Sequence, residues 1–518
     1  MKINILDCTL RDGGYINNFR FGTNRIQTIT EKLCAANIEI IECGFLQSGQ
    51  TDVERTLYSG VEWIPLPKER GDHTFVAMIA FGEINAYEIA PHQPDYIDGI
   101  RLTFHNDEWD ETRLLAMNIM EKGYKVFIQP VGTASYTDEE LLYLVKQVNE
   151  LNPYAFYIVD TLGSMYKNDL LRMFFLVEHN LAKGISLGFH SHNNMQLSFA
   201  NSMTLLELHT ERHIIIDSSV FGIGRGAGNL NTELITHYIN NNIDERYDLI
   251  PLLELIDDII LPIYKYTPWG FSEPYYLSAI TGVHPNYASY LIDKQSVGMT
   301  KISELLKMLP EENKHLFNRK NVESIYLADM SNKTEDAEAI EELSNAISDK
   351  KVLVLAPGSS VRSHSTFINE KIEELKLFVI SINFAPEEIK PDLVFVSNRK
   401  RFGQLNLSDI PIAVTSNISV NHTATTYIIE YDSLLQENSD SSGIMVLRFL
   451  KRLGVSHALL AGYDGFTGGA DHYSDRLDSF LSAEAVVSLN RSMNDQLRRV
   501  SDTISLEFIT PTAYEGLT

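Results

Sequence analysis

The sequence predicts an α/β protein: a (β/α)8 TIM barrel with a helical extension, followed by a Rossmann-like α/β domain. Short apolar or β-branched segments recur eight times in the first 240 residues, with amphipathic stretches between them. Polar residues stand at the end of nearly every segment, and in a barrel these ends converge on the face that carries the active site. A second series of strand-like segments begins at Lys351.

Eight strands are predicted for the barrel. Helices are predicted between them, among them 24–37 and 137–150, whose apolar residues recur every three to four positions. Thr137 precedes Glu140 by three residues, which is typical of a capping box. A doubly wound sheet is the alternative, but the number of units and the polar strand ends favour a barrel. The predicted strands are 3–8, 38–45, 74–81, 96–104, 124–131, 155–162, 185–192 and 213–221.

We expect several domains, because 518 residues are too many for one ordinary domain. After the barrel comes a helical segment, expected to pack on it, and then an acidic, polar stretch. The predicted parts are the barrel (1–240), the helical extension (241–330), a linker (331–350) and the Rossmann-like domain (351–518). Strands of the last domain are predicted within 350–360, 377–384, 391–398, 411–417, 424–431 and 457–466.

Charge and composition limit the partners. The formal net charge is −26, which argues against nucleic acid and anionic membranes and favours cations, including divalent metals. The sequence has no apolar run of the roughly 18 residues that a membrane span needs, and no apolar signal region after Met1. Cys8, Cys34 and Cys43 lack zinc-site spacing and are expected to be reduced thiols. We therefore expect a cytoplasmic protein.

The strand ends supply the candidate site. His190 and His192 alternate by two on an extended segment, so both side chains face the same way. Together with Asp12 they would form a group of two histidines and one carboxylate, which leaves metal positions open for substrate and water. The alternative is a pair of partly exposed surface histidines, and for Arg11-Asp12 a surface turn. The other polar residues at strand ends are Glu42, Arg101, His105, Gln129, Asp160, Thr161, Ser191 and the run from Arg225 to Asn229.

A glycine-rich stretch, "GIGRGAG" at 222–228, follows the last predicted barrel strand. It satisfies a loose dinucleotide-binding pattern. Barrels, however, often build anion sites after their final strands. We expect a tight loop that brings Asn229 to the metal and Arg225 to an anionic group, rather than a site for NAD.

Four motifs resemble those of a known protein family. "TLRDGG", "IEIIECGF", "GFHSHNN" and "GIGRGAGN" resemble, in the same order, the motifs of the DRE-TIM metallolyases. The 4-hydroxy-2-oxovalerate aldolases look closest, because "GIGRGAGN" and "TGVHPNYASYL" resemble their late motifs. The resemblance covers residues 3 to about 325.

The resemblance implies roles for matching residues. Asp12, His190 and His192 would bind Mg²⁺ or Mn²⁺, with Asn229 as a further ligand or support. Arg11 would face the enolate oxygen, and Glu42 would hold Arg11. Tyr287 matches a tyrosine of the aldolase pocket. The aldolases carry a histidine as general base soon after R-D-G, where this chain has Tyr15. The candidates for proton transfer are therefore Tyr15, Tyr287, His105 and a metal-bound water.

The C-terminal part resembles a group of bacterial sugar-transfer proteins that includes sialyltransferases and glycan-modification proteins. The turn after 352–355 would suit a phosphate at a helix N-terminus. Alternatively, this domain binds a regulator or stabilises an oligomer. The resemblance implies five residues near a nucleotide or sugar, namely Ser359, Ser360, Asn383, Asn398 and Asp464.

Taken together, the sequence predicts a divalent-metal-dependent aldolase or lyase. It would make or break a carbon–carbon bond next to a 2-oxo acid, with an aldehyde as second substrate and a surface-glycan sugar as a candidate product. Gln129, Asp160, Thr161 and Arg225 are expected to bind substrate. The alternatives are an acyl-CoA-dependent Claisen synthase of the same superfamily, or a glycan-modification protein with a non-catalytic barrel. We expect a homo-oligomer.

Overall fold

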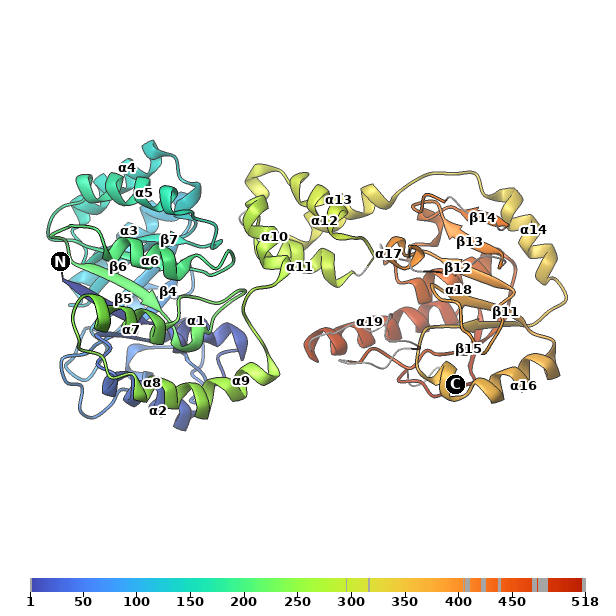
Figure 1. Cartoon of the computed structure of the whole chain (residues 1–518), viewed down its shortest axis with the longest axis horizontal. Coiled ribbons are helices and arrows are strands. Elements are labelled where there is room, and N and C mark those ends of the chain that lie inside the picture. Colours follow the sequence, from blue (N-terminus) through green and yellow to red (C-terminus); the bar gives the residue numbers. More distant parts are fainter. Residues whose placement is uncertain are drawn as a thin grey trace. The chain divides into compact units, whose positions relative to one another are not determined.

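The computed structural model forms two compact units, which are described separately (Figure 1). One comprises Met1–Ser289 with Lys314–Phe317, and the other comprises Tyr290–Asn313 with Asn318–Thr518. The structure describes residues 2–294, 296–314, 317–403, 405, 410–420, 425–436, 439–467, 473 and 483–514. No helix in these ranges is long and apolar enough to cross a membrane.

The first unit is a closed barrel of eight parallel strands, as predicted. Closure is established by β1, which pairs with β9 on one side and with β2 on the other. This pairing excludes a doubly wound sheet. A short ninth strand, β3 (Leu57–Tyr58), adds to β2. The barrel strands are β1 (Ile3–Asp7), β2 (Ile40–Leu46), β4 (Thr74–Ala80), β5 (Gly99–Phe104), β6 (Lys125–Pro130), β7 (Ala155–Asp160), β8 (Ser186–Ser191) and β9 (Ile214–Ser218).

Helices follow most of the strands. The two predicted helices are confirmed as α2 (Thr23–Ala35) and α4 (Asp138–Leu151). The expected capping box of α4 is present, because Glu140 N donates to Thr137 Oγ1 at 3.2 Å. The other helices around the barrel are α3 (Trp109–Glu121), α5 (Lys167–Asn180), α6 (Ser198–Leu206), α7 (Thr232–Asn242) and α8 (Ile250–Leu255).

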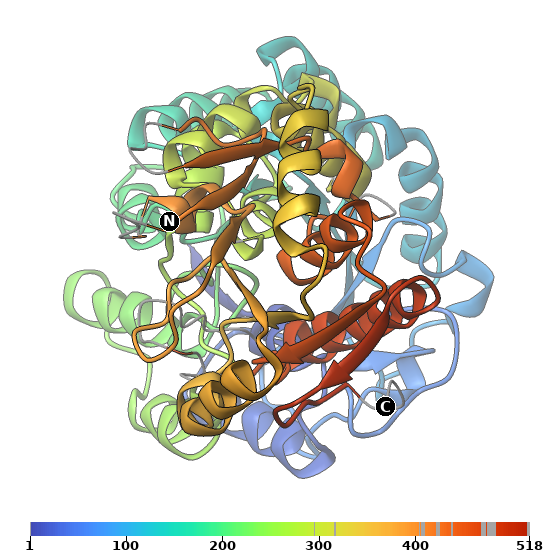
Figure 2. The ribbon, with the colours of Figure 1, turned by 90° about the vertical axis from the view of Figure 1, so that its right-hand side faces the viewer.

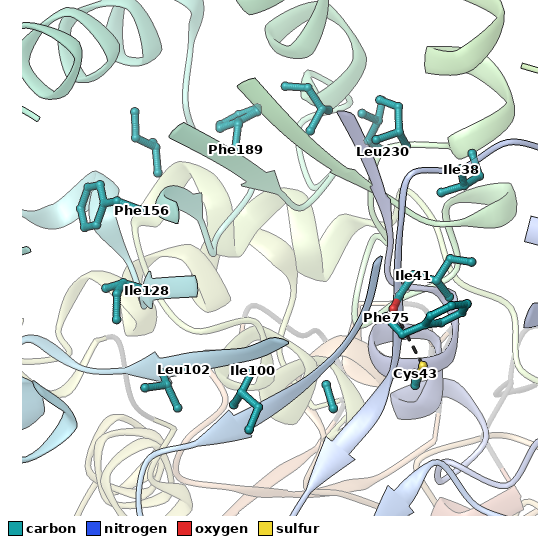
Figure 3. Packing of buried hydrophobic residues seen from close by; sticks show 14 of the residues in the cluster. Ile38, Ile41, Cys43, Phe75, Ile100, Leu102, Ile128, Phe156, Phe189 and Leu230 are labelled. Atoms are coloured by element: carbon teal, nitrogen blue, oxygen red, sulfur yellow. Dashed lines mark hydrogen bonds between the residues drawn. The ribbon is translucent and has the colours of Figure 1, made fainter. Parts of the chain in front are cut away.

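The barrel strands alternate between a helix-facing and an interior surface. Figure 3 shows side chains such as Ile41, Ile100 and Leu102 in the buried cluster that also includes residues of the surrounding helices. Residues between them along a strand face the barrel interior. Arg101 stands between Ile100 and Leu102, and Glu42 stands between Ile41 and Cys43, so both charged side chains enter the barrel.

The second unit contains a seven-stranded, all-parallel sheet, coloured orange to red in Figure 2. Its order is β14-β13-β12-β11-β10-β15-β16, so the direction of winding reverses between β10 and β15, which is the topological switch point of the sheet. All six predicted strands are confirmed, and β16 was not predicted. The strands are β10 (Val352–Leu355), β11 (Phe378–Ile382), β12 (Leu393–Val396), β13 (Ile412–Thr415), β14 (Thr426–Ile429), β15 (His457–Ala461) and β16 (Ser505–Phe508).

The residues between the two sheets are helical, as predicted. Polar contacts attach two of these helices, α13 (Arg319–Met330) and α14 (Ala337–Ile347), to residues of the second sheet and its helices. Asp329 of α13 pairs with Arg399 (2.9 Å), and Asp336, the N-cap of α14, accepts two hydrogen bonds from Arg452 (2.6 and 2.7 Å). The predicted domain limits stay predictions. The other helices between the two sheets are α9 (Leu261–Tyr266), α10 (Glu273–Thr281), α11 (Pro285–Asp293) and α12 (Met299–Lys307).

Five further helices connect the strands of the second sheet along the chain. They are α15 (Ser360–Ser363), α16 (Ser365–Leu375), α17 (Arg399–Phe402), α18 (Ser442–Arg452) and α19 (Ala483–Ser501).

Candidate metal-dependent active site

A buried network of charged side chains extends from the barrel interior, where Glu42 and Arg101 lie within β2 and β5, to the carboxyl ends of β1, β8 and β9. Glu42 Oε2 accepts from Arg11 Nε at 2.8 Å and lies 2.7 Å from Arg101 Nη1. Arg101 also pairs with Asp217, which follows the apolar run of β9. We call Arg11, Asp12, Glu42, Arg101, His190 and Asp217 the inner network; each is at most 5% exposed.

The turn after β1 positions two members of this network. Residues Thr9–Asp12 form the short helix α1, and Gly13–Ile16 continue it as a 3-10 turn, η1. A Cβ atom at Gly14 would lie 2.2 Å from the Phe19 ring, and one at Gly13 would lie 2.9 Å from Ile223. The two glycines are therefore required by close packing, which holds Arg11 and Asp12 at the end of the barrel.

Three predicted metal ligands are in direct contact. Asp12 Oδ2 lies 3.5 Å from His190 Nε2 and accepts from Asn229 Nδ2 at 2.9 Å. The rings of His190 and His192 are 5.2 Å apart, centroid to centroid. A hydrogen bond of 3.0 Å joins His190 Nδ1 to Asp217 Oδ2. This second contact orients the ring so that Nε2 faces Asp12, the arrangement typical of a metal-binding histidine with a supporting carboxylate.

The protonation states suit a metal ion. Burial opposes ionisation of Asp12, but Arg11 and the two histidines hold the pKa of its carboxyl well below the usual range. Burial lowers the pKa of His192 to about 4, although Asp12 opposes the shift. Near neutral pH the site therefore offers a carboxylate and a neutral imidazole, the forms that bind metals.

Two further observations, on unpaired atoms and on net charge, support a metal ion at this site. Asn229 Oδ1 and His192 Nδ1 are buried and have no hydrogen-bond partner among the described residues. The inner network contains three carboxylates and two guanidinium groups, so the charges of these five groups sum to −1. A divalent cation would give Asn229 Oδ1 a partner and would change this net charge from −1 to +1.

Cys8 lies beside this group. Its Sγ, a carboxylate oxygen of Asp12 and a ring nitrogen of His190 are all within 4.8 Å of one another. Burial raises the pKa of the Cys8 thiol, and its Sγ–H donates to Ser218 O at 3.1 Å. Because the thiol is protonated and already paired, oxygen and nitrogen donors are the better ligands here, and hard cations such as Mg²⁺ and Mn²⁺ favour such donors.

Three predicted substrate-binding residues differ in their surroundings. Gln129 joins the inner network, since its Nε2 donates to Asp217 Oδ2 at 3.4 Å. Asp160 accepts from the backbone N–H groups of Ser164 and Met165 at 2.9 and 3.0 Å, and Thr161 Oγ1 accepts from Gly132 N at 2.8 Å. Asp160 and Thr161 thus hold loops at the barrel end in place.

The side chains of Tyr15, Arg225 and His284 form a second group, which we call the outer cluster. The Arg225 guanidinium lies 5.9 Å from the centre of the Tyr15 ring, and its Nη2 contacts His284 Nε2. Burial, aided by Arg225, lowers the pKa of His284 to about 3, so this imidazole is neutral. Tyr15 is 46% exposed, and partial burial raises the pKa of its phenol although Arg11 opposes the shift.

The other two candidates for proton transfer lie differently. Tyr287 is fully buried on α11, with its ring 5.1 Å from that of Phe317, and its backbone N donates to His284 O at 3.0 Å. His105 is half-buried after β5, and its backbone N donates to Glu108 Oε2 at 2.6 Å. In the described ranges no hydrogen bond or ion pair joins His105 to the inner network.

The five residues predicted for the C-terminal domain lie in two groups at strand ends. Asp464 accepts from Ser360 N (2.8 Å), contacts the Ser360 hydroxyl and accepts from Ser359 Oγ at 3.4 Å. Asn383 Oδ1 accepts from the backbone N–H groups of Ser397 and Asn398 at 3.0 and 3.3 Å, and Asn398 Oδ1 accepts from Arg401 N at 2.9 Å. The first group lies at the switch point between β10 and β15.

Sequence reasoning missed two contributors to the barrel site. Asp217 was given no role, although a carboxylate within "HIIIDSSVF" interrupts an otherwise apolar strand. His284 stands on the segment between α10 and α11, and nothing in its local sequence connects it to Arg225, 59 residues earlier.

Comparison with known proteins agrees with this geometry. Residues 109–259 match the HMGL-like family. An oxaloacetate decarboxylase from Mycobacterium tuberculosis is 26% identical over 239 residues, 45% of this chain and 68% of the relative. A 4-hydroxy-2-oxovalerate aldolase from Geobacillus thermodenitrificans is 22% identical over 294 residues, 55% of this chain and 82% of the relative.

A solved N-terminal domain from Bacteroides vulgatus, assigned to an aldolase, is 24% identical; it covers 56% of this chain and 96% of that chain, with a TM-score of 0.47. The strand pairing of this chain, not that value, establishes the barrel. Residues 109–259 are thus similar to HMGL-like proteins, in agreement with the predicted resemblance to the DRE-TIM metallolyases. The distant relatives include 4-hydroxy-2-oxovalerate aldolases and an oxaloacetate decarboxylase.

Proposed function

We propose that the barrel makes or breaks the carbon–carbon bond between C3 and C4 of a 2-oxo acid, by stabilising an enolate. One observation carries this proposal. Arg11 Nη2 is buried and has no hydrogen-bond partner among the described residues, while Nε of the same guanidinium is bonded to Glu42 and Nη1 lies 3.3 Å from Asp12. A buried donor without an acceptor is costly unless a ligand supplies the acceptor.

The ligand that fits is an oxygen on which negative charge develops. A divalent metal, Mn²⁺ or Mg²⁺, held by Asp12, His190 and His192 with Asn229 as a further ligand or support, would supply a Lewis acid for that oxygen. Arg11 would donate to the same oxygen from Nη2. Because the oxygen is more negative in the enolate than in the ketone, this donor stabilises the enolate more and lowers the barrier.

Glu42, Arg101 and Asp217 act as positioning residues in this scheme. Glu42 holds the guanidinium of Arg11 and is itself held by Arg101. Asp217 fixes the ring of His190 and is held by the second arm of Arg101. The two halves of the site are thus joined through one fully buried arginine.

The proposed bond changes balance without an oxidant or reductant. In the direction of synthesis, C3 of the 2-oxo acid loses a proton and forms a bond to the aldehyde carbon, and the aldehyde oxygen takes up a proton. Cleavage reverses these changes. We assign the proton transfer at the aldehyde oxygen to Tyr15, because its phenol is protonated near neutral pH and interacts with the charges of Arg11 and Asp12. Tyr287 and His105 remain alternatives.

Product analysis tests the proposal and its runner-up together. Protein supplied with Mn²⁺, pyruvate and an aldehyde should form a 4-hydroxy-2-oxo acid, detected by NMR and mass spectrometry. The alternative, a Claisen synthase, would instead consume acetyl-CoA and a 2-oxo acid and release free CoA. Release of CoA without any aldol product would contradict the aldolase function and support the Claisen synthase instead. A role in surface-glycan sugar biosynthesis is a separate proposal and is not needed for either reaction.

A further inference from the structure

The outer cluster differs from the inner network in the sign of its charge. Arg11 and Arg101 are both paired with carboxylates. Arg225 contacts only a neutral imidazole and an aromatic ring in the described structure, and no carboxylate of the described residues lies within ion-pair distance of it. In a chain of net charge −26, a cation beside an active site without an acidic partner needs an explanation.

The donors of the outer cluster outnumber its acceptors. A neutral imidazole has one acceptor nitrogen. Two N–H groups are directed at the ring of His284: Asn286 N approaches Nδ1 at 3.2 Å, and Arg225 Nη2 approaches Nε2. Whichever tautomer is present, one ring nitrogen carries hydrogen and faces another donor. An acceptor placed among Arg225, His284 and the Tyr15 phenol would resolve the conflict.

One short loop connects this cluster to the candidate metal ligands. Asn229 donates to Asp12, and Arg225 stands four residues earlier on the same loop. Four residues span at most about 14 Å, and the loop is shorter because Gly228 N donates back to Arg225 O at 3.1 Å. A small molecule that reaches Asp12 and His190 at one end can therefore reach Arg225 at the other.

We infer that Arg225 and His284 form a subsite for a second carboxylate, so that the enzyme acts on dicarboxylic 2-oxo acids. This inference rests on the proposed function and names its substrate class. The first carboxylate and keto oxygen lie at the metal centre, and the second carboxylate, beyond the bond that breaks, accepts from Arg225 and from the His284 N–H. One guanidinium with a neutral imidazole carries a single positive charge, which matches a carboxylate better than a doubly charged phosphate.

Matched pairs of ligands test the subsite without depending on turnover. The pairs are 2-oxosuccinate with 2-oxobutanoate, 2-oxoglutarate with 2-oxopentanoate, and 2-oxoadipate with 2-oxohexanoate. Each pair has the same number of carbons and differs in a terminal carboxylate in place of a methyl group. Binding to the full chain is measured by calorimetry with Mg²⁺ present. At least one dicarboxylate should bind on the order of 10- to 100-fold more tightly than its counterpart, as expected for hydrogen bonds to a charged group.

Variants assign this preference to the cluster. Arg225→Gln should reduce the ratio of the two dissociation constants to about one, and Arg225→Lys should restore part of it because the charge returns without the planar fork. Arg172→Gln is the matched control: it removes an exposed arginine that pairs with Asp138 outside the barrel, and it should keep the ratio of the wild type. Circular dichroism verifies folding of each variant.

Two outcomes overturn the inference. One is equal binding within all three pairs by the wild type, and the other is a preference that survives in Arg225→Gln. Failure of the proposed function is seen separately, as absence of metal-dependent exchange of the methyl protons of pyruvate in D2O. If the protein prefers dicarboxylates but does not exchange these protons, the carboxylate subsite is supported and the proposed aldolase function is contradicted.

Discussion

The two parallel sheets of this protein both carry polar residues at their carboxyl ends, but these residues are used differently. At the end of the barrel, buried polar atoms of Arg11, His192 and Asn229 have no partner in the described structure. At the switch point of the second sheet, Asp464 is occupied by the backbone and hydroxyl of Ser360. In the barrel the unsatisfied atoms stand together near Asp12 and can share one ligand, whereas at this switch point the satisfied ones hold a loop in shape.

This difference explains why the barrel supports a specific proposal and the second sheet does not. Asn383 and Asn398 each accept hydrogen bonds from nearby backbone N–H groups. Polar residues at the ends of parallel strands can be nucleotide ligands or loop supports. The contacts of these residues favour support, so a nucleotide or sugar site in this unit remains a prediction from resemblance alone.

The largest effect is expected from removing a metal ligand. His192→Ala should abolish both metal binding and exchange of the pyruvate methyl protons, because the remaining donors leave the ion weakly held. Metal content by mass spectrometry and exchange by NMR measure the two losses. Full exchange in this variant, or undiminished exchange in excess EDTA, would remove the metal from the mechanism.

Arg11→Lys should have the next largest effect. Lysine keeps the charge, but its donors all lie on one nitrogen, so it loses the planar fork that places Nε on Glu42 and Nη2 in the site. Turnover should fall on the order of 100- to 1000-fold, the usual cost of losing an oxyanion donor. Unchanged turnover in a folded variant would make Arg11 a purely structural partner of Glu42.

Asp217→Asn should weaken the metal rather than remove it. The carboxylate orients His190 through a 3.0 Å contact, and loss of such a support typically costs about 10- to 100-fold in metal affinity. Titration with Mn²⁺, followed by electron paramagnetic resonance, gives the affinity. If the affinity is unchanged but the midpoint of urea unfolding falls, Asp217 serves only the buried ion pair with Arg101.

The smallest effect belongs to the second sheet. Asp464→Ala leaves Ser360 N without its acceptor, so the free energy of unfolding should fall by about 1–3 kcal/mol. Ser359→Ala is the control, because that serine is exposed and its 3.4 Å contact is long. A variant at Asp464 that is as stable as the wild type but loses affinity for nucleotides would turn the loop support into a ligand site.

Much of this architecture follows from local sequence. All eight barrel strands and six of the seven strands of the second sheet are apolar runs that a pattern can identify. The seventh, β16, reads Ser-Leu-Glu-Phe, and its polar positions conceal a strand at the sheet edge. The strand order of each sheet agrees with the predicted fold classes, a TIM barrel and a Rossmann-like domain. Crossover connections between parallel strands allow few other strand orders.

The site was less predictable, because its contacts join residues distant in the chain. Asp12 and the two histidines follow from the pattern of strand ends. Asp217 requires knowledge of which face of β9 points inward, and His284 requires the folded position of the segment before α11. The local sequence shows only that Asp217 interrupts an apolar strand, and the partners of Asp217 and His284 are 27 and 59 positions away.

The central claim is that the unpaired Nη2 donor of Arg11, together with a metal ion held by Asp12, His190 and His192, stabilises an enolate. Exchange of the methyl protons of pyruvate in D2O measures that step directly, without any second substrate. The wild type with Mn²⁺ should replace the methyl protons with deuterium far faster than the metal ion alone, and EDTA should stop the exchange until Mn²⁺ is restored. Metal-loaded, folded protein that leaves the methyl signal intact would contradict the account.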